Sequence, residues 1–190
     1  MLKDNIIYVY VYSNDSLDND ISLPDSLLSN INKYKDINKR NIKLTKYNRL
    51  LKKVKELGYD TNSFKYINGI PKLDNLYIST SDSKKYYGFC ISNVSNGIDI
   101  EEEVYGKRYD NLSKYLSNIE YDEYIDPVLK WTIEEAYSKY LGTGITKESL
   151  NTKKELTDYF WYKIDKTYIT IYKKNYNVVL YLNDKEIKNA

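Results

Sequence analysis

Residues Asn96–Glu103, NGIDIEEE, begin with a polar residue and a glycine and then alternate isoleucine with acid. In a β-strand, side chains two residues apart point to the same face. We therefore expect Ile98 and Ile100 to face a core, and Asp99 and Glu101 to stand side by side on the opposite face. Two carboxylates this close repel each other unless a cation lies between them. The stretch favours either a Mg²⁺ site or a solvated acidic face on an outer strand.

Composition narrows the possible chemistry. The chain contains 42% hydrophobic and 29% charged residues, which is typical of a soluble globular protein with a sizeable core. It has no histidine, which excludes His-based triads and His-ligated zinc. Any acid–base chemistry must use a carboxylate, a lysine or a tyrosine. The single cysteine, Cys90, excludes an internal disulfide and is expected to pack as a small apolar residue.

Charge is unevenly distributed along the chain, although the net charge is only +2. Ten basic residues lie between Lys33 and Lys55, opposed only by Asp36. Nine acidic residues lie between Asp99 and Asp126, opposed by three basic ones. This distribution favours an acidic or phosphate-bearing partner for the first region and a metal for the second. Two solvated faces are the alternative.

The first residues, MLKDNIIYVYVYSND, carry no cationic leader and no cleavage site, so no signal peptide is predicted. Their apolar run is also far too short to span a membrane. We expect a cytoplasmic protein with neither a membrane nor a nucleic-acid partner.

Runs of β-branched and aromatic residues predict strands on both sides of the central stretch. They are Asn5–Tyr12, Leu76–Thr80, Tyr86–Val94, Tyr159–Ile164, Tyr168–Lys174 and Asn177–Leu182. Apolar residues recur at three- and four-residue spacing from about Leu23 to Leu57, which predicts helical structure ending at Gly58. Further helices are predicted in Tyr109–Asn118 and Ile119–Tyr124.

This order of elements predicts an α+β fold. The 190 residues suit one domain or two small, closely packed parts. Because strands, helices and strands occur twice, we expect two roughly similar halves, residues 1–95 and 96–190, joined near Ser95.

The best-marked helix begins at Asp126. Asp126 is a good N-cap, Pro127 suits the first helical position, and Gly142 suits the C-terminal cap. Glu135 and Lys139 lie four residues apart and therefore share one face of this helix. Taken alone, that pair is typical of an exposed salt bridge contributing about 0.3–0.5 kcal/mol.

Five blocks of the chain carry a resemblance to a known family. The central pair is GIDIE at 97–101 and WTIEEAYSKYLGTGI at 131–145. The other blocks are RNIKLTKYNR at 40–49, NGIPKLDNLYISTS at 68–81 and KYLSNIEYDEY at 114–124. In order and spacing from Arg40 to Ile145 these blocks resemble the Sfp-type 4′-phosphopantetheinyl transferase family, whose signature pairs an I-D-I-E strand with a W-x-x-K-E-A/S-x-x-K-x-x-G-x-G helix.

The resemblance implies a fold of two α/β halves related by pseudo-twofold symmetry, with the active site in the cleft between them. It implies transfer of 4′-phosphopantetheine from CoA to a serine of an acyl or peptidyl carrier protein, with release of 3′,5′-ADP. The resemblance implies that Asp99, Glu101 and Glu135 would bind Mg²⁺, and that Glu135 would also be the general base. It implies that Lys139 would contact a phosphate. The residues that would bind CoA are Arg40, Ser79, Thr80 and Lys139. A monomer would close its own cleft.

Three positions depart from the family pattern. Thr80 replaces its histidine, and Ile70 and Glu134 replace two of its lysines. Each change removes a cation that faces phosphate in the family, so a degenerate homologue that binds CoA or a carrier protein without turnover is the alternative. Four lysines are candidates to restore the charge: Lys43, Lys72, Lys84 and Lys85. Glu102 and Glu103 are expected to form the acidic margin of the following loop.

Overall fold

The computed structural model describes residues 2–18, 22–67, 70–73, 75–116, 125–146 and 157–187, which form a mixed α+β fold. The larger sheet has the strand order β10-β9-β1-β5-β4, and a second sheet has the order β6-β8-β7. Their strands are β1 (Ile6–Ser13), β4 (Tyr77–Asp82), β5 (Tyr86–Ser92), β6 (Gly97–Glu102), β7 (Tyr159–Ile164), β8 (Thr167–Tyr172), β9 (Asn177–Leu182) and β10 (Lys185–Glu186). The hairpin of β2 (Lys65–Ile67) and β3 (Ile70–Lys72) stands apart from both.

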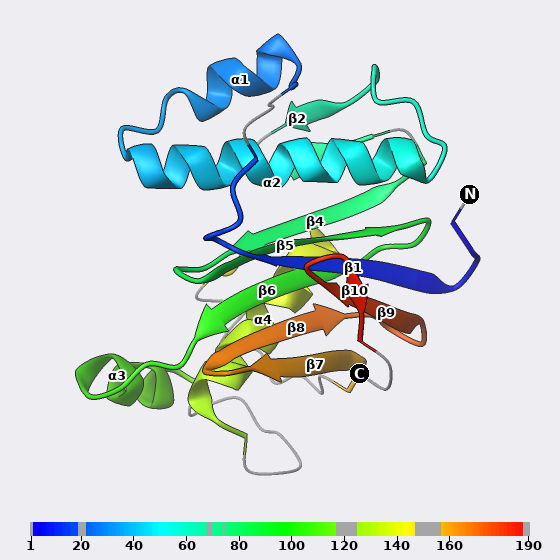
Figure 1. The fold of residues 1–190 in the computed structure, drawn as a ribbon. Coiled ribbons are helices and arrows are strands. Elements are labelled where there is room, and N and C mark those ends of the chain that lie inside the picture. Colours follow the sequence, from blue (N-terminus) through cyan, green and yellow to red (C-terminus); the bar gives the residue numbers. More distant parts are fainter. Residues whose placement is uncertain are drawn as a thin grey trace.

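Helices cover the outer faces of the two sheets. The four described helices are α1 (Asp25–Ile31), α2 (Ile37–Glu56), α3 (Lys107–Tyr115) and α4 (Pro127–Leu141). Figure 1 shows α1 and α2 on one side of the larger sheet and α4 behind β6 and β8. The layers therefore run helix, sheet, sheet, helix. None of the described helices has the length and apolarity that crossing a bilayer requires.

Period-two alternation directs each strand toward two different cores. In β1, Ile7, Val9 and Val11 pack between the two sheets, whereas Tyr10 and Tyr12 pack toward α2. The same sheet-to-sheet core contains Cys90, which is fully buried, and the two isoleucines of β6. The predicted inward direction of Ile98 and Ile100 and the predicted apolar packing of Cys90 are therefore confirmed.

The two sheets share one order of connection. In β1–β5–β4, strand β1 is followed by helices α1 and α2. It pairs antiparallel with β5, which is the second strand of the hairpin β4–β5. In β6–β8–β7, the arrangement is the same, with β6 paired to β8 and β8 to β7. The chain then returns to the larger sheet, because β9 pairs parallel with β1. The strands after residue 95 are thus divided between both sheets.

The helical structure predicted over residues 23–57 consists of two helices, α1 and α2. Asp36 ends the linker between them and accepts a hydrogen bond from the Lys39 backbone N–H, so it caps the start of α2. At its other end, Gly58 adopts φ 86°, a left-handed conformation that suits glycine after a helix. The helix predicted at residues 109–118 begins two residues earlier as α3, and the one predicted at 119–124 lies outside the described residues.

The capping pattern of α4 is confirmed. The Asp126 side chain accepts a hydrogen bond of 2.8 Å from the Val128 backbone N–H, and Pro127 is the first helical residue. The helix ends at Gly142, whose φ of 71° is left-handed. Local sequence therefore fixes both ends of the helix that carries Glu135 and Lys139.

Candidate functional site

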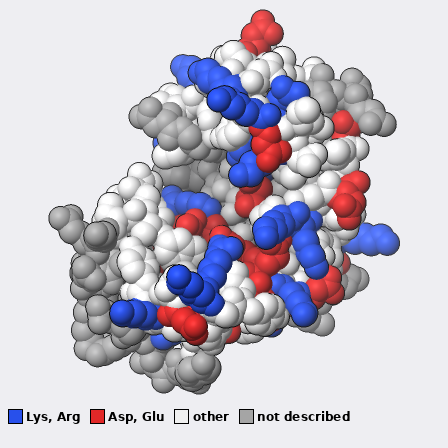
Figure 2. Space-filling model, turned by 90° about the vertical axis from the view of Figure 1, so that its left-hand side faces the viewer, with Lys and Arg blue, Asp and Glu red and all other residues white. Residues whose placement is uncertain are grey.

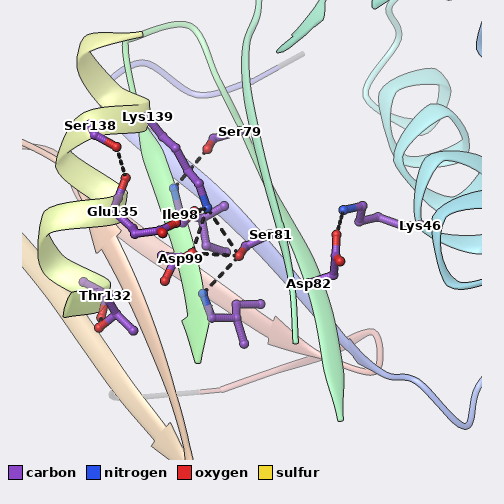
Figure 3. Close-up of polar contacts among 12 residues, drawn as sticks. Lys46, Ser79, Ser81, Asp82, Ile98, Asp99, Thr132, Glu135, Ser138 and Lys139 are labelled. Carbon is purple, nitrogen blue, oxygen red and sulfur yellow. Dashed lines mark hydrogen bonds and ion pairs between the residues drawn. The ribbon is translucent and has the colours of Figure 1, made fainter. Parts of the chain in front are cut away.

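Helix α4 lies unusually close to strand β6 because the strand begins with glycine. A Cβ built on Gly97 would lie 1.9 Å from the Ala136 backbone oxygen and 2.7 Å from the Tyr140 backbone nitrogen. A side chain at residue 97 would therefore force the helix away from the strand. The close approach places Glu135 and Lys139 of α4 directly over the outer face of β6 (Figure 3).

Asp99 is the centre of the polar cluster that forms there. It is only 3% exposed. Its Oδ1 accepts hydrogen bonds from Lys139 Nζ at 2.7 Å and from Ser81 Oγ at 2.9 Å (Figure 3). Its Oδ2 is buried and has no N–H or hydroxyl donor among the described residues, although the Glu135 side chain is close enough to share a hydrogen bond with the Asp99 carboxylate when Glu135 is protonated. One oxygen of this carboxylate is thus held by two donors, and the other has no such donor among the described residues.

The Lys139 ammonium is held by groups of the strand and the helix. It donates to the Ile98 backbone oxygen at 3.0 Å and lies 3.6 Å from Glu135 Oε2. Burial lowers the pKa of Lys139, but Asp99 and Glu135 outweigh that effect and raise it above its ordinary value. Lys139 therefore stays charged, and its main ionic partners are the carboxylates of Asp99 and Glu135.

Glu101 and Glu135 complete a group of three carboxyl groups. Burial, and then the nearby Asp99 carboxylate, raise the pKa of each glutamate to about 7. Arg108 only partly offsets this at Glu101, since its Nη2 lies 3.6 Å from Glu101 Oε2. Burial is the larger cause at both glutamates, and the remainder of the rise reflects the negative charge of Asp99 that the nearby cations do not fully offset.

The chemistry of the donors suits a hard divalent cation, but in the described residues they are not arranged as a complete metal site. The carboxylate oxygens are of the kind that Mg²⁺ prefers, and the Asp99 Oδ2 acceptor has no N–H or hydroxyl donor in the described residues. The described residues contain no ready-made group of three metal ligands, and Lys139 lies between Asp99 and Glu135. If a metal binds, Asp99, Glu101 and Glu135 are the residues that would hold it.

A cleft of about 750 Å³ adjoins this cluster. One wall comes from β3, β4 and the residues between them, and the other from the end of α4 and the loop that follows. The lining includes Ser79, Thr80 and Lys139, three of the residues predicted to bind CoA, together with Ile70 and Lys72. Lys72 and Lys139 are the only cations among the described residues that line it.

Arg40 and most of the candidate replacement cations lie elsewhere. Arg40 is in the first turn of α2 and is not among the residues that line the cleft. Lys43 Nζ lies 3.4 Å from Asp82 Oδ1. Lys84 and Lys85 belong to the turn between β4 and β5. Lys72 is therefore the one candidate replacement among the described residues that reaches the cleft.

Thr80 points to the other face of β4 from its two serine neighbours. Its side chain shares a hydrogen bond with Tyr47 of α2. Ser79 and Ser81 instead face β6, where their hydroxyls accept hydrogen bonds from the backbone N–H groups of Ile98 and Ile100. Thr80 and Ser79 both line the cleft, but Ser79 is already engaged by the strand beside it.

Two further acids lie outside the cluster: alternation turns Glu102 to the other face, and Glu103 follows the last residue of β6. Glu102 accepts a hydrogen bond from the Lys85 backbone N–H at 2.7 Å. Glu103 pairs with Lys163. Glu134, next to Glu135, is 1% exposed and so lies on the buried side of α4, not in the cluster. Of the neighbouring acids, the structure gathers only Asp99, Glu101 and Glu135.

Sequence reasoning missed Ser81 and the pair Lys46–Asp82. Lys46 is buried, and it forms a hydrogen-bonded ion pair with Asp82. Lys46 lies in a lysine-rich stretch of the sequence, and no sequence pattern distinguishes it from the exposed lysines near it. Ser81 could have been found, because serine recurs every second residue in the stretch ISTS just as acid does in IDIE. The matching periods would have indicated two facing strands.

The surface around the site is strongly charged. In Figure 2, acidic side chains gather beside a hollow near the middle of the face, with lysine and arginine side chains above and below them. The view agrees with the uneven charge distribution along the chain.

The scan against protein-family models found no match, and the search of curated proteins found none either.

Proposed function

We propose that this protein transfers 4′-phosphopantetheine from CoA to a serine of an acyl or peptidyl carrier protein in a Mg²⁺-dependent reaction. The observation that carries the proposal is the meeting of Asp99, Glu101, Glu135 and Lys139 beside a 750 Å³ cleft. These residues come from a strand and a helix about 30 residues apart in the chain. Lys139 lines the cleft that a diphosphate could enter, and Asp99 and Glu135, which pair with Lys139, are not themselves among the lining residues.

The chain's own residues would divide the work of phosphoryl transfer. Glu135 is one-third exposed and could accept the proton of an incoming serine hydroxyl. Lys139 and Lys72 would hold phosphate oxygens from opposite walls of the cleft, since both line it. A bound Mg²⁺ would supply neutralisation of the charge that develops on the transferred phosphoryl group. Asp99, Glu101 and Glu135 would hold that ion.

The shared connection order of the two sheets supports the two-half organisation that the family resemblance implies. The units β1–β5–β4 and β6–β8–β7 are each built from a strand, helices and a hairpin. The cleft lies between them, with residues 70–80 on one side and residues 138–144 on the other. A pseudo-twofold relation between halves 1–95 and 96–190 is part of this proposal, with β9 and β10 returning to the first sheet.

A second candidate function, binding of CoA or a carrier protein without turnover, is favoured by the cation shortage in the cleft. Ile70 and Thr80 line it where the family pattern has a lysine and a histidine. Lys139 donates to Asp99 and to the Ile98 backbone oxygen, so it has little capacity left for a phosphate. Both features predict weaker CoA binding than the complete pattern would give.

Release of 3′,5′-ADP separates the two functions. The purified full chain is incubated with CoA, Mg²⁺ and separate apo acyl and peptidyl carrier proteins, and the nucleotide products are resolved by chromatography. The transferase predicts 3′,5′-ADP only when a carrier and Mg²⁺ are both present. CoA that remains intact in every mixture, while calorimetry shows that it binds, would establish the binding protein instead.

A further inference from the structure

Two serine hydroxyls join the sheets along the seam between β4 and β6. The two strands belong to different sheets and share no backbone ladder. Instead, Ser79 Oγ accepts a hydrogen bond of 3.0 Å from the Ile98 backbone N–H, and Ser81 Oγ accepts one of 3.2 Å from the Ile100 backbone N–H (Figure 3). Both serines are buried. The two serines are equivalent in this one respect, that each accepts a hydrogen bond from a backbone N–H of β6.

Ser81 differs from Ser79 in the acceptor to which its hydroxyl proton is donated. A serine hydroxyl has one proton to donate. Because Ser81 Oγ accepts from Ile100 N–H, its orientation is set by the seam, and its proton points to Asp99 Oδ1 at 2.9 Å. Ser79 has no such bond to a carboxylate among the residues that the structure describes. The seam therefore fixes the direction of one donor toward the centre of the acidic cluster.

The hydrogen bonds of Asp99 fall on one oxygen only. Oδ1 receives both Ser81 and Lys139, the latter at 2.7 Å. Oδ2 is buried and receives no N–H or hydroxyl donor from the described residues, and the carboxyl group beside Asp99 is that of Glu135, the other residue that would hold the ion. An aspartate carboxylate without such a restraint rotates broadly about its last side-chain bond. Two donors on one oxygen hold the group in a single orientation, with the free oxygen directed away from them.

We infer that Ser81 is a positioning residue that orients the Asp99 carboxylate so that Oδ2 is presented to a divalent cation. The inference rests on the metal role of Asp99 in the proposed function. It deepens that role, because it assigns one carboxylate oxygen to the protein and the other to the ion. Groups that hydrogen-bond a metal ligand orient it, and their loss weakens metal binding about 10- to 100-fold.

Titration of the full chain with Mn²⁺, followed by electron paramagnetic resonance of the free ion, tests this without CoA or a carrier. Ser81→Ala should weaken Mn²⁺ binding about 10- to 100-fold. Ser79→Ala is the matched control, because it removes the same kind of seam bond but none to Asp99. It should lower Tm less than Ser81→Ala, because Ser81 also donates to the Asp99 carboxylate, and should leave the Mn²⁺ affinity near that of the wild type. Ser81→Thr keeps the hydroxyl and should recover most of the affinity.

A double variant shows whether Ser81 acts through Asp99. In an Asp99→Asn background, Ser81→Ala should cause no further loss of Mn²⁺ affinity. Equal losses from Ser79→Ala and Ser81→Ala, or no loss from Ser81→Ala, would overturn the inference. Carrier modification by the wild type is measured separately, so the proposed transfer stands or falls on its own result. A wild type that binds no Mn²⁺ would overturn the positioning role along with the metal role.

Discussion

Lys139 Nζ lies 2.7 Å from Asp99 Oδ1, although the two residues are 40 positions apart in the chain. This ion pair ties helix α4 to strand β6 at a point where Asp99 is buried. From the sequence alone, loss of Asp99 should relieve repulsion between neighbouring carboxylates. The structure reverses that expectation, because loss of Asp99 would leave the partly buried Lys139 ammonium with one partner fewer.

Asp99→Asn should abolish Mg²⁺-dependent transfer and also lower stability. The lost hydrogen bond to a charged group corresponds to about 1.5–3 kcal/mol of unfolding free energy. Glu102→Gln is the control, because Glu102 faces away and accepts a hydrogen bond from the Lys85 backbone. Urea unfolding and carrier modification measure the two effects. Comparable loss of transfer in Glu102→Gln would mean that the strand does not direct its acids as described.

Glu135 and Glu134 should separate activity from stability. Glu135→Gln removes a proton acceptor that is about one-third exposed, so transfer should fall at least about 100-fold with little change in Tm. Glu134→Gln alters a side chain that is 1% exposed, so Tm should change while transfer continues. Steady-state kinetics and thermal unfolding test both variants together. Equal kinetic losses would place the wrong glutamate in the site.

Gly97→Ala should separate α4 from β6. The new Cβ would overlap the Ala136 backbone oxygen, and backbone yields less than a flexible side chain. We expect a loss of about 3 kcal/mol or more, together with loss of divalent-cation binding. Gly58→Ala meets no atom within 4 Å and strains only its own φ of 86°, so it should cost about 1–2 kcal/mol and leave cation binding intact. Unchanged cation affinity in Gly97→Ala would contradict the close approach.

Asp82 should be needed mainly to balance Lys46. Lys46 is 1% exposed, whereas about a third of the Asp82 side chain meets solvent. Asp82→Asn leaves the buried ammonium without its carboxylate, which should cost on the order of 3 kcal/mol. Adding Lys46→Met should recover most of that loss, because an apolar side chain of similar length needs no partner. A double variant as unstable as Asp82→Asn in urea unfolding would contradict this view of the pair.

The same pair predicts the direction of a pH effect on stability. Burial raises the pKa of Asp82, but Lys46 and Lys43 outweigh it and lower the pKa from 3.8 to about 2. Between these values the unfolded state binds more protons than the folded state. The contribution of Asp82 is therefore complete above about pH 4 and is lost as the pH falls toward 2. At the basic end, burial lowers the pKa of Lys46 to about 8, so the unfolded state binds more protons between pH 8 and 10.5 and the cost of burying the Lys46 charge is relieved as the pH rises through that range.

That pH effect is measured as the difference in unfolding free energy between the wild type and the double variant Lys46→Met/Asp82→Asn. The subtraction removes the titration of the other acids, which both proteins share. The difference should shrink as the pH falls from 4 to 2. A difference that stays constant over this range would show that Asp82 is not held ionised by the two lysines.

Local patterns predicted the features that depend on neighbouring residues. The caps of α4 and the alternation in β6 are examples, since a cap or a strand face is set within a few residues. Distant contacts decided the rest. The close approach at Gly97, the burial of Lys46 and the return of β9 to β1 each require a partner far away in the chain. No local pattern contains that information.

The candidate site shows the same division. Alternation placed Asp99 and Glu101 on one face, and helical spacing placed Glu135 beside Lys139. That the strand and helix faces meet followed from the family resemblance, and the structure brings them together. The positions of Arg40 and Thr80 were less well anticipated: Arg40 lies outside the cleft lining, and Thr80 hydrogen-bonds Tyr47. Both depend on how α2 packs over the larger sheet.

The mass of an apo carrier protein, measured after incubation with this protein, CoA and Mg²⁺, tests the central claim most directly. Wild-type protein and Glu135→Gln are compared side by side, with EDTA added to a third sample. The proposed transferase predicts a carrier heavier by one phosphopantetheine group with the wild type alone, on a serine that tandem mass spectrometry can locate. Acyl and peptidyl carriers that all keep their apo mass with the wild type, while CoA binding is measurable, would contradict it.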